Sequence, residues 1–238
     1  MTTNEKRLQH IIRFYTIMDT LKDKLGGYKR LETFTNGSSW VKRGVYFFFE
    51  DGELRSDSGE GMRVVHVGTH AMRDGGNTTL WDRLRNHRGS EKSGGGNHRC
   101  SAIRKHIGQA YLDRDPGHRI EKTTWANGTF APWDIRLQEH DLEMTVSNHI
   151  RNMPFLYLGV EDDPSPYSQR GYISRNVIGL LSNYDKPPID SPSDQWLGLH
   201  VHSPGDRIHR SGLWNVKHVD HEYDPHVLMT MDLLVKKM

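Results

Sequence analysis

Four short features of the sequence carry side chains that could act together. Two are tripeptides about twenty residues apart, Gly44-Val45-Tyr46 and His66-Val67-Gly68. In the third, Arg83 precedes His87 by four residues, and residues at this spacing share one face of a helix. The fourth is the stretch GYISRNVIGLLSNY (171–184), in which Ser174 stands at the edge of an apolar stripe. The planar guanidinium of Arg83 fits phosphate oxygens, which indicates a phosphate as its partner.

Basic side chains gather around the glycine-rich segment 90–97. The net charge of the whole chain is only +2 with neutral histidines, so the local distribution has to indicate the partner. A local basic patch of this kind can follow the phosphates of a polyanion. The members of the cluster are Arg83, Arg85, His87, Arg88, Lys92, His98, Arg99, Arg104, Lys105 and His106.

The first half of the chain predicts the elements that position these groups. Residues 4–25 carry apolar side chains at helical spacing. Residues 43–50 and 62–68 are aromatic and β-branched runs, which are typical of strands. Because only the loop 51–61 separates them, we expect them to pair antiparallel. A helix should follow at 77–89, where Thr79 and Asp82 have the spacing of a capping box.

The second half predicts further helices and one more strand. Helical spacing recurs at 99–115 and 138–153, and 154–162 reads as a third strand. The segment between the two helices, 113–136, reads as irregular, and the chain from 186 onward reads mostly as loop, held to the core by Trp196, Trp214 and Tyr223. Helices around a small sheet make this an α/β or α+β fold.

Composition restricts the class of protein. The chain has 238 residues with 34% hydrophobic and 26% charged residues, which is typical of a globular protein. Cys100 is its one cysteine, which excludes a disulfide framework and favours a reducing compartment. We find no apolar run long enough for a membrane span and no signal peptide, and we therefore expect a cytoplasmic protein.

The two tripeptides, the Arg83-x-x-x-His87 pair and the helix at 171–184 together resemble the GIY-YIG nuclease family, and most closely its restriction-endonuclease branch. The resemblance covers residues 43–185. It implies a small, mostly antiparallel three-stranded sheet flanked by helices. It also implies a helical extension at 1–40, a core at 41–185 with an insertion at about 90–137, and a C-terminal extension at 186–238 packed on the core.

The family resemblance implies a metal-dependent endonuclease that hydrolyses phosphodiester bonds of double-stranded DNA, of restriction or defence type. Tyr46 would activate the water, Arg83 and His87 would stabilise and orient the reacting groups, and His66 would contact the phosphate. Asn183 would end the helix of the metal site, and Mg²⁺ (or Mn²⁺) would neutralise the leaving oxygen. A homodimer would supply two active sites. The residues expected to contact DNA are Arg85, Arg88, Lys92, Arg99, Arg104 and Lys105.

Two positions depart from the family pattern. His66 stands where the family usually has tyrosine, and Ser174 stands where the metal-binding glutamate is expected. A serine hydroxyl lacks the anionic oxygen that a hard divalent cation prefers. Either serine was introduced in place of glutamate, or the natural chain has serine.

If the natural chain has serine, either another acidic residue binds the metal ion or the nuclease activity is lost. The acids near this helix are Glu161, Asp162, Asp163 and Asp185. We therefore expect the chain with Ser174 to cleave DNA poorly. The alternatives are an inactive DNA-binding module of the same fold and, more remotely, a regulatory domain.

Overall fold

The computed structural model describes residues 2–34, 41–115, 124–201 and 206–238. An antiparallel sheet with the strand order β1-β4-β2-β3 lies at the centre of the fold. Its strands are β1 (Lys29–Arg30), β2 (Gly44–Leu54), β3 (Met62–Gly68) and β4 (Pro154–Gly159). This confirms the small antiparallel sheet and the β2–β3 pair, and adds the short strand β1 at one edge.

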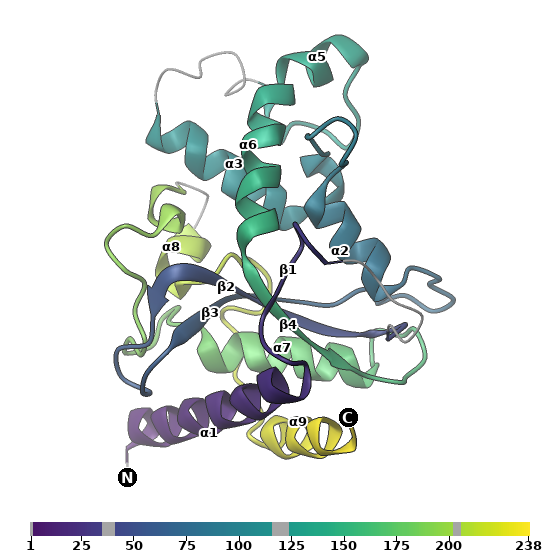
Figure 1. The fold of residues 1–238 in the computed structure, drawn as a ribbon. Coiled ribbons are helices and arrows are strands. Elements are labelled where there is room, and N and C mark those ends of the chain that lie inside the picture. The colour runs from purple at the N-terminus through teal and green to yellow at the C-terminus, as the bar shows by residue number, and fades with distance from the viewer. Residues whose placement is uncertain (1, 35–40, 116–123, 202–205) are drawn as a thin grey trace.

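Helices cover both faces of the sheet (Figure 1). Side chains alternate along a strand, so successive residues of β2 face different layers. Val45, Phe47 and Phe49 pack with α1 (Thr3–Lys24), α7 (Gln169–Leu181) and α9 (His226–Lys237). Tyr46 and Phe48 face the other layer. That layer contains α2 (Leu80–Arg88), α3 (Ala102–Arg114) and α6 (His140–Asn152).

The register of β2 and β3 sets the two tripeptides side by side. Tyr46 pairs with Gly68, and Phe48 pairs with His66. A Cβ atom added at Gly68 would lie 2.2 Å from the Tyr46 hydroxyl oxygen, so the tyrosine ring covers the space that a side chain would need. Glycine at position 68 therefore permits the placement of the Tyr46 ring.

Helix α2 begins and ends as its sequence predicts. Thr79 accepts a hydrogen bond from the Asp82 amide, and the Asp82 side chain accepts one from the Thr79 amide, which completes the predicted capping box. The helix buries Leu80 and Leu84 against the sheet and ends at Gly89, whose φ is 77°. Arg83 and His87 are thereby held beside Tyr46.

The predicted insertion contributes to the core. It contains the 3₁₀ turn η1 (His98–Cys100), helix α3 and most of the short helix α5 (Trp133–Gln138). Ile103 and Ile107 of α3 are fully buried beside Tyr46 and Phe48. The prediction of an irregular segment at 113–136 overlooked α5, and residues 116–123 of that segment lie outside the described part of the chain.

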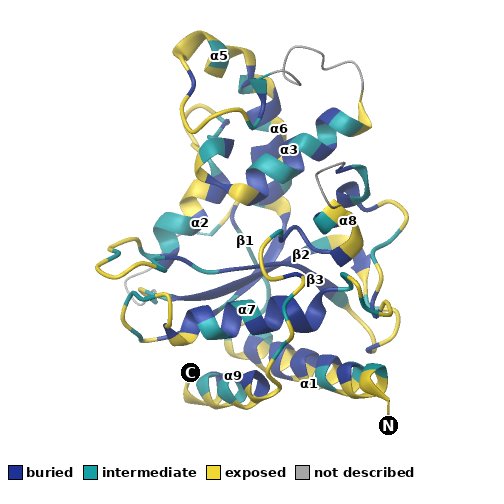
Figure 2. Ribbon diagram, turned by 180° about the vertical axis from the view of Figure 1, so that it is seen from behind, coloured by how far each residue is buried: buried dark blue, intermediate teal, exposed yellow. Residues whose placement is uncertain are grey.

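The described part of the tail is mostly loop, as predicted, but three helical elements that the prediction did not include interrupt it. The turn η2 (Leu197–His200), α8 (Arg207–Ser211) and α9 all lie in it. Helix α9 buries Val227, Leu228, Met231 and Val235 against α1 and α7, at a helical spacing that we overlooked among many prolines and histidines. Trp196 and Trp214 are buried, as predicted. Figure 2 shows the buried sides of α1 and α7 turned inward. Among the described helices we find none with the length and apolar character needed to cross a bilayer.

Candidate active site

Three buried side chains form a hydrogen-bonded chain between β2, α2 and α3. The Tyr46 hydroxyl lies 2.7 Å from His87 Nε2, and His87 Nδ1 lies 2.7 Å from Ser101 Oγ. Tyr46, His87 and Ser101 are 1%, 0% and 2% exposed. Ser101 is also the N-cap residue of α3 and accepts a hydrogen bond from the Arg104 amide. One hydroxyl thus starts a helix and fixes the imidazole ring.

The charges around Tyr46 and His87 determine where their protons sit. Burial, followed by the nearby Arg83 charge, holds the pKa of His87 well below its usual range, so the imidazole is neutral at pH 7. Burial raises the pKa of Tyr46, and the charge of Arg83 and a hydrogen bond from it oppose that rise. Tyr46 therefore keeps its proton and can donate it to His87 Nε2, while His87 Nδ1 donates to Ser101.

Arg83 and His66 complete this cluster. A hydrogen bond from Arg83 Nη1 to the Cys100 carbonyl oxygen, 3.2 Å long, orients the guanidinium. Burial and the Arg83 charge lower the pKa of His66 to about 3, and this ring also bonds to the backbone of Trp214. Within the described structure, His66 Nδ1 and Arg83 Nε are buried and have no partner. A buried acceptor and a buried donor thus remain unpaired beside Tyr46.

His70 and Ser101 are functional neighbours that sequence reasoning missed. His70 Nε2 accepts a bond of 3.4 Å from the Gly44 amide, and His70 Nδ1 lies 2.9 Å from the Thr78 carbonyl oxygen. It therefore ties β2 to the start of α2. Ser101 had a local signal, because serine before a helical pattern is a common N-cap. His70 had none, because its partners lie in separate segments.

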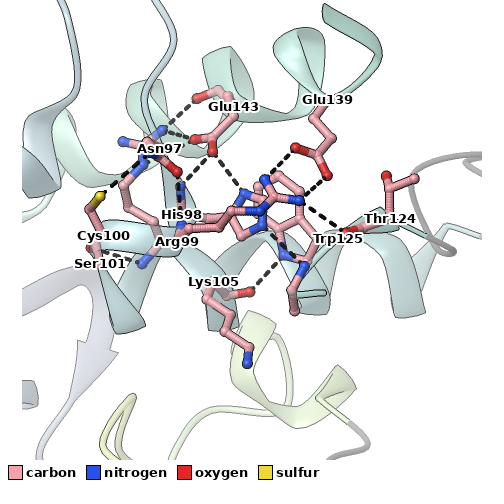
Figure 3. A network of polar contacts seen from close by, with 12 residues as sticks. Asn97, His98, Arg99, Cys100, Ser101, Lys105, Thr124, Trp125, Glu139 and Glu143 are labelled. Atoms are coloured by element: carbon pink, nitrogen blue, oxygen red, sulfur yellow. Dashed lines mark hydrogen bonds and ion pairs between the residues drawn. The ribbon is translucent and has the colours of Figure 1, made fainter. Parts of the chain in front are cut away.

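Two of the arginines predicted to contact DNA are instead part of a buried network (Figure 3). The Arg99 guanidinium binds both carboxylate oxygens of Glu139, at 2.6 and 2.8 Å, and its side chain is 5% exposed. Arg104 is fully buried, and its guanidinium bonds to the Glu143 carboxylate and, at 2.8 Å, to the His87 carbonyl oxygen. These predictions are corrected because a solvated phosphate cannot reach guanidinium groups that carboxylates already surround.

The other predicted DNA contacts lie nearer the surface. Arg85 and Lys92 are exposed and Lys105 is half-buried. Arg88 is 9% exposed, its guanidinium lies 5.2 Å from the Trp81 ring centre, and its Nη1 pairs with Glu91 at 2.6 Å. The cationic surface is therefore smaller than the sequence suggests, and Arg85 and Lys92 are its most accessible members.

Ser174 and Asn183 lie outside this cluster. Helix α7 packs on the sheet face opposite to Tyr46 and His87, and Ser174 is buried within it. The Asn183 side chain accepts a hydrogen bond of 2.8 Å from Arg7 and donates one of 3.1 Å to the Ile189 carbonyl oxygen. The structure therefore brings together Tyr46, His66, Arg83 and His87, without these two residues.

The residues at hand do not fit a divalent metal ion. Asp162, Asp163 and Asp185 form ion pairs with Arg170, Arg43 and Arg210, respectively. Over the ranges that the structure describes, no group of three His, Cys, Asp or Glu side chains is placed to hold a metal. Ser174 offers only a neutral hydroxyl, whereas Mg²⁺ prefers carboxylate oxygens.

The geometry can be compared with known proteins. No curated protein and no solved structure matches the chain. A family model described as the GIY-YIG domain matches residues 5–238. This match includes both tripeptides, the Arg83–His87 helix, the insertion and the tail. The chain therefore belongs to the GIY-YIG domain family.

Proposed function

We propose that the chain is an endonuclease that acts on double-stranded DNA and, in this form, hydrolyses phosphodiester bonds slowly. Membership of the GIY-YIG family indicates nuclease activity, and therefore a nucleic acid as substrate. The observation that carries the proposal is the buried chain from Tyr46 through His87 to Ser101, with Arg83 beside it. Such a chain can move a proton while a cation holds the phosphate.

The proposed roles follow from the protonation states. Arg83 binds the non-bridging phosphate oxygens, and His66 Nδ1 accepts a hydrogen bond from the attacking water. Tyr46 takes the proton of that water as its own proton passes to His87 Nε2. The water oxygen bonds to phosphorus, the bond from phosphorus to the leaving sugar oxygen breaks, and that oxygen takes up a proton from the solvent. The imidazolium formed in this step is costly, because burial disfavours a charged His87. This cost is the reason why we expect slow cleavage.

A second candidate is a DNA-binding module that does not cut. The specific observation in its favour is the lack of a fitting metal site near Tyr46 in the described structure. Both candidates share the basic surface and the fold, so DNA binding does not separate them. We derive no step through Mg²⁺ or Mn²⁺ for either of them.

A plasmid-nicking assay separates the two candidates. The wild-type chain, Tyr46→Phe, Arg83→Ala and Ser174→Glu are compared in Mg²⁺ and in EDTA. For an endonuclease, we expect slow nicking by the wild-type chain and a decrease of about 10²-fold in Tyr46→Phe and Arg83→Ala. We expect Ser174→Glu to cut no faster than the unaltered chain, because Ser174 is buried on the sheet face opposite to Tyr46 and His87. If all four chains bind the plasmid and none nicks it, the endonuclease proposal fails and the chain is a DNA-binding module.

DNA affinity is expected to depend on Arg85 and Lys92 and to be insensitive to EDTA. Each exposed cation that contacts a phosphate adds about 0.9 to the slope of log affinity against log salt concentration. We therefore expect Arg85→Gln and Lys92→Gln each to lower that slope by about 0.9 in fluorescence anisotropy titrations. Arg13→Gln is the matched control, because Arg13 is exposed on α1, on the other side of the sheet. Equal slopes for all three variants would place the DNA elsewhere.

A further inference from the structure

Three large apolar side chains stand out into solvent at the outer end of the insertion. Phe130, Trp133 and Leu137 are 80%, 74% and 57% exposed. Trp133 and Leu137 are four residues apart on α5, so they share one side of it. A cluster of exposed large apolar side chains on a folded protein typically marks a binding surface. We call these three residues the α5 tip.

Two adjacent cavities, together called the groove, lie between α2 and the α5 tip. One cavity of about 410 Å³ lies between α2 and the glycine-rich loop, with Arg85 and Asn86 in its wall. A second, of about 240 Å³, has Trp133, Arg136 and Leu137 in its wall. Gly96 and Asn97 line both cavities, so the two are adjacent. The groove therefore runs along the outer surface of the insertion.

The groove opens next to the candidate active site. Cys100 lines the first cavity, and its carbonyl oxygen accepts the hydrogen bond from Arg83. The next residue, Ser101, holds His87. The first cavity is thus linked to Arg83 and His87 through Cys100 and Ser101.

The charge of the groove suits an anionic chain. Glu91, Glu139 and Glu143 line it, but Arg88, Arg99 and Arg104 pair with their respective carboxylates. Arg85 lies at the α2 end and Arg136 at the α5 end, and both are exposed. Cations at both ends, with aromatic rings at the outer one, match the backbone and the bases of a nucleic acid.

A network of stacked rings, hydrogen bonds and ion pairs precedes and follows the α5 tip in the chain, and Figure 3 shows its members. The rings of His98 and Trp125 stack with centroids 3.7 Å apart, and Trp125 Nε1 donates to the Lys105 carbonyl oxygen at 2.9 Å. The Arg99–Glu139 pair then ties η1 to the start of α6, directly after α5. Groups held on a fixed base lose little conformational freedom on binding.

We propose that the α5 tip is a wedge that enters double-stranded DNA at a base step while the backbone follows the groove toward Arg83. Phe130 and Trp133 stack on the separated bases, and Arg85 and Arg136 contact phosphates on either side. Apolar wedges of this kind unstack a step at a cost of a few kcal/mol, which the added contacts offset. This inference rests on the proposed function, since it takes DNA as the substrate.

The test measures affinity and base unstacking separately. DNA duplexes with 2-aminopurine at each position in turn are titrated with the wild-type chain, Phe130→Ala/Trp133→Ala and Tyr167→Ala. The control residue Tyr167 is 90% exposed and lies just before α7, on the other layer. Stacking contributes about 1–3 kcal/mol per base, so we expect the double variant to bind at least tenfold more weakly. It should also lose the 2-aminopurine signal that the wild-type chain and Tyr167→Ala produce.

Each other outcome has a distinct meaning. If the wild-type chain binds no duplex, the proposed function fails. If it binds and the double variant behaves like Tyr167→Ala, the wedge is overturned and the proposed function stands. Analytical sedimentation tests whether a second copy of the chain binds the α5 tip instead of DNA. If the wild-type chain is a dimer and the double variant is a monomer with unchanged DNA affinity, the α5 tip is a contact between copies and the wedge is overturned.

Discussion

Replacing Arg104 with methionine is expected to lower the free energy of unfolding by about 3–5 kcal/mol, because the change leaves the buried Glu143 carboxylate without its main partner. Arg104 is fully buried, and its guanidinium also donates to Ser147 Oγ and the His87 carbonyl oxygen. Glu143 would keep only His98, whose amide and Nδ1 lie 2.6 and 2.9 Å from Oε1. Urea denaturation monitored by circular dichroism measures the loss.

Two further variants test the cause of that loss. Arg85→Met removes an exposed arginine from the preceding helix and should change stability by less than about 0.5 kcal/mol. Arg104→Met combined with Glu143→Leu removes both charges and should recover part of the stability, since an apolar pair can replace a buried ion pair. A double variant less stable than Arg104→Met would show that packing, and not the unpaired charge, dominates.

Acid is expected to destabilise the fold steeply below pH 6.5. Burial is the largest cause that lowers the pKa of His66 to about 3 and of His70 to about 4. Their pKa in the unfolded chain is about 6.5, so below that pH the unfolded state binds protons that the folded state does not. Stability is therefore complete above about pH 6.5 and falls with pH until the folded pKa values are reached. At pH 5 the loss is about 2 kcal/mol for each of the two residues.

His87 adds to this loss, because burial lowers its pKa as well. The measurement is urea denaturation at pH 5.0 and 7.5, together with NMR titration of the imidazole resonances. His226→Gln serves as the control, because the His226 side chain is 78% exposed and its removal should leave the pH dependence unchanged. Equal stability at both pH values, or a folded His66 that titrates near pH 6.5, would contradict the expectation.

The parts of the site that could be predicted from the sequence are those with local signals. The β2–β3 pair follows from two apolar runs joined by a short polar loop, and the start of α2 follows from Thr79 and Asp82. Once those elements are placed, the four-residue spacing brings Arg83 and His87 to one side of α2, next to Tyr46. In the structure, a hydrogen bond joins Tyr46 and His87.

The parts that could not be predicted depend on tertiary partners. Arg99 and Arg104 look like solvated cations in the sequence, because Glu139 and Glu143 are about 40 residues away along the chain. Whether Ser174 and Asn183 share a layer with Tyr46 depends on which face of the sheet α7 covers, and periodicity does not determine that face. The sequence of helix α9 has apolar residues at helical spacing, but the many prolines and histidines that precede it favoured the prediction of a loop.

Ser101 has two structural roles, and this limits which segments of the chain can be deleted. Because the hydroxyl that caps α3 also holds the His87 ring, a change that disorders the start of α3 should also disorder His87. Trimming the chain to a minimal core by deleting 90–137 would remove the support of His87 along with α3. A shortened chain would need a new hydrogen-bond acceptor for His87 Nδ1. In hydrogen exchange, the amides of α3 and the C-terminal turn of α2 should open as one cooperative unit.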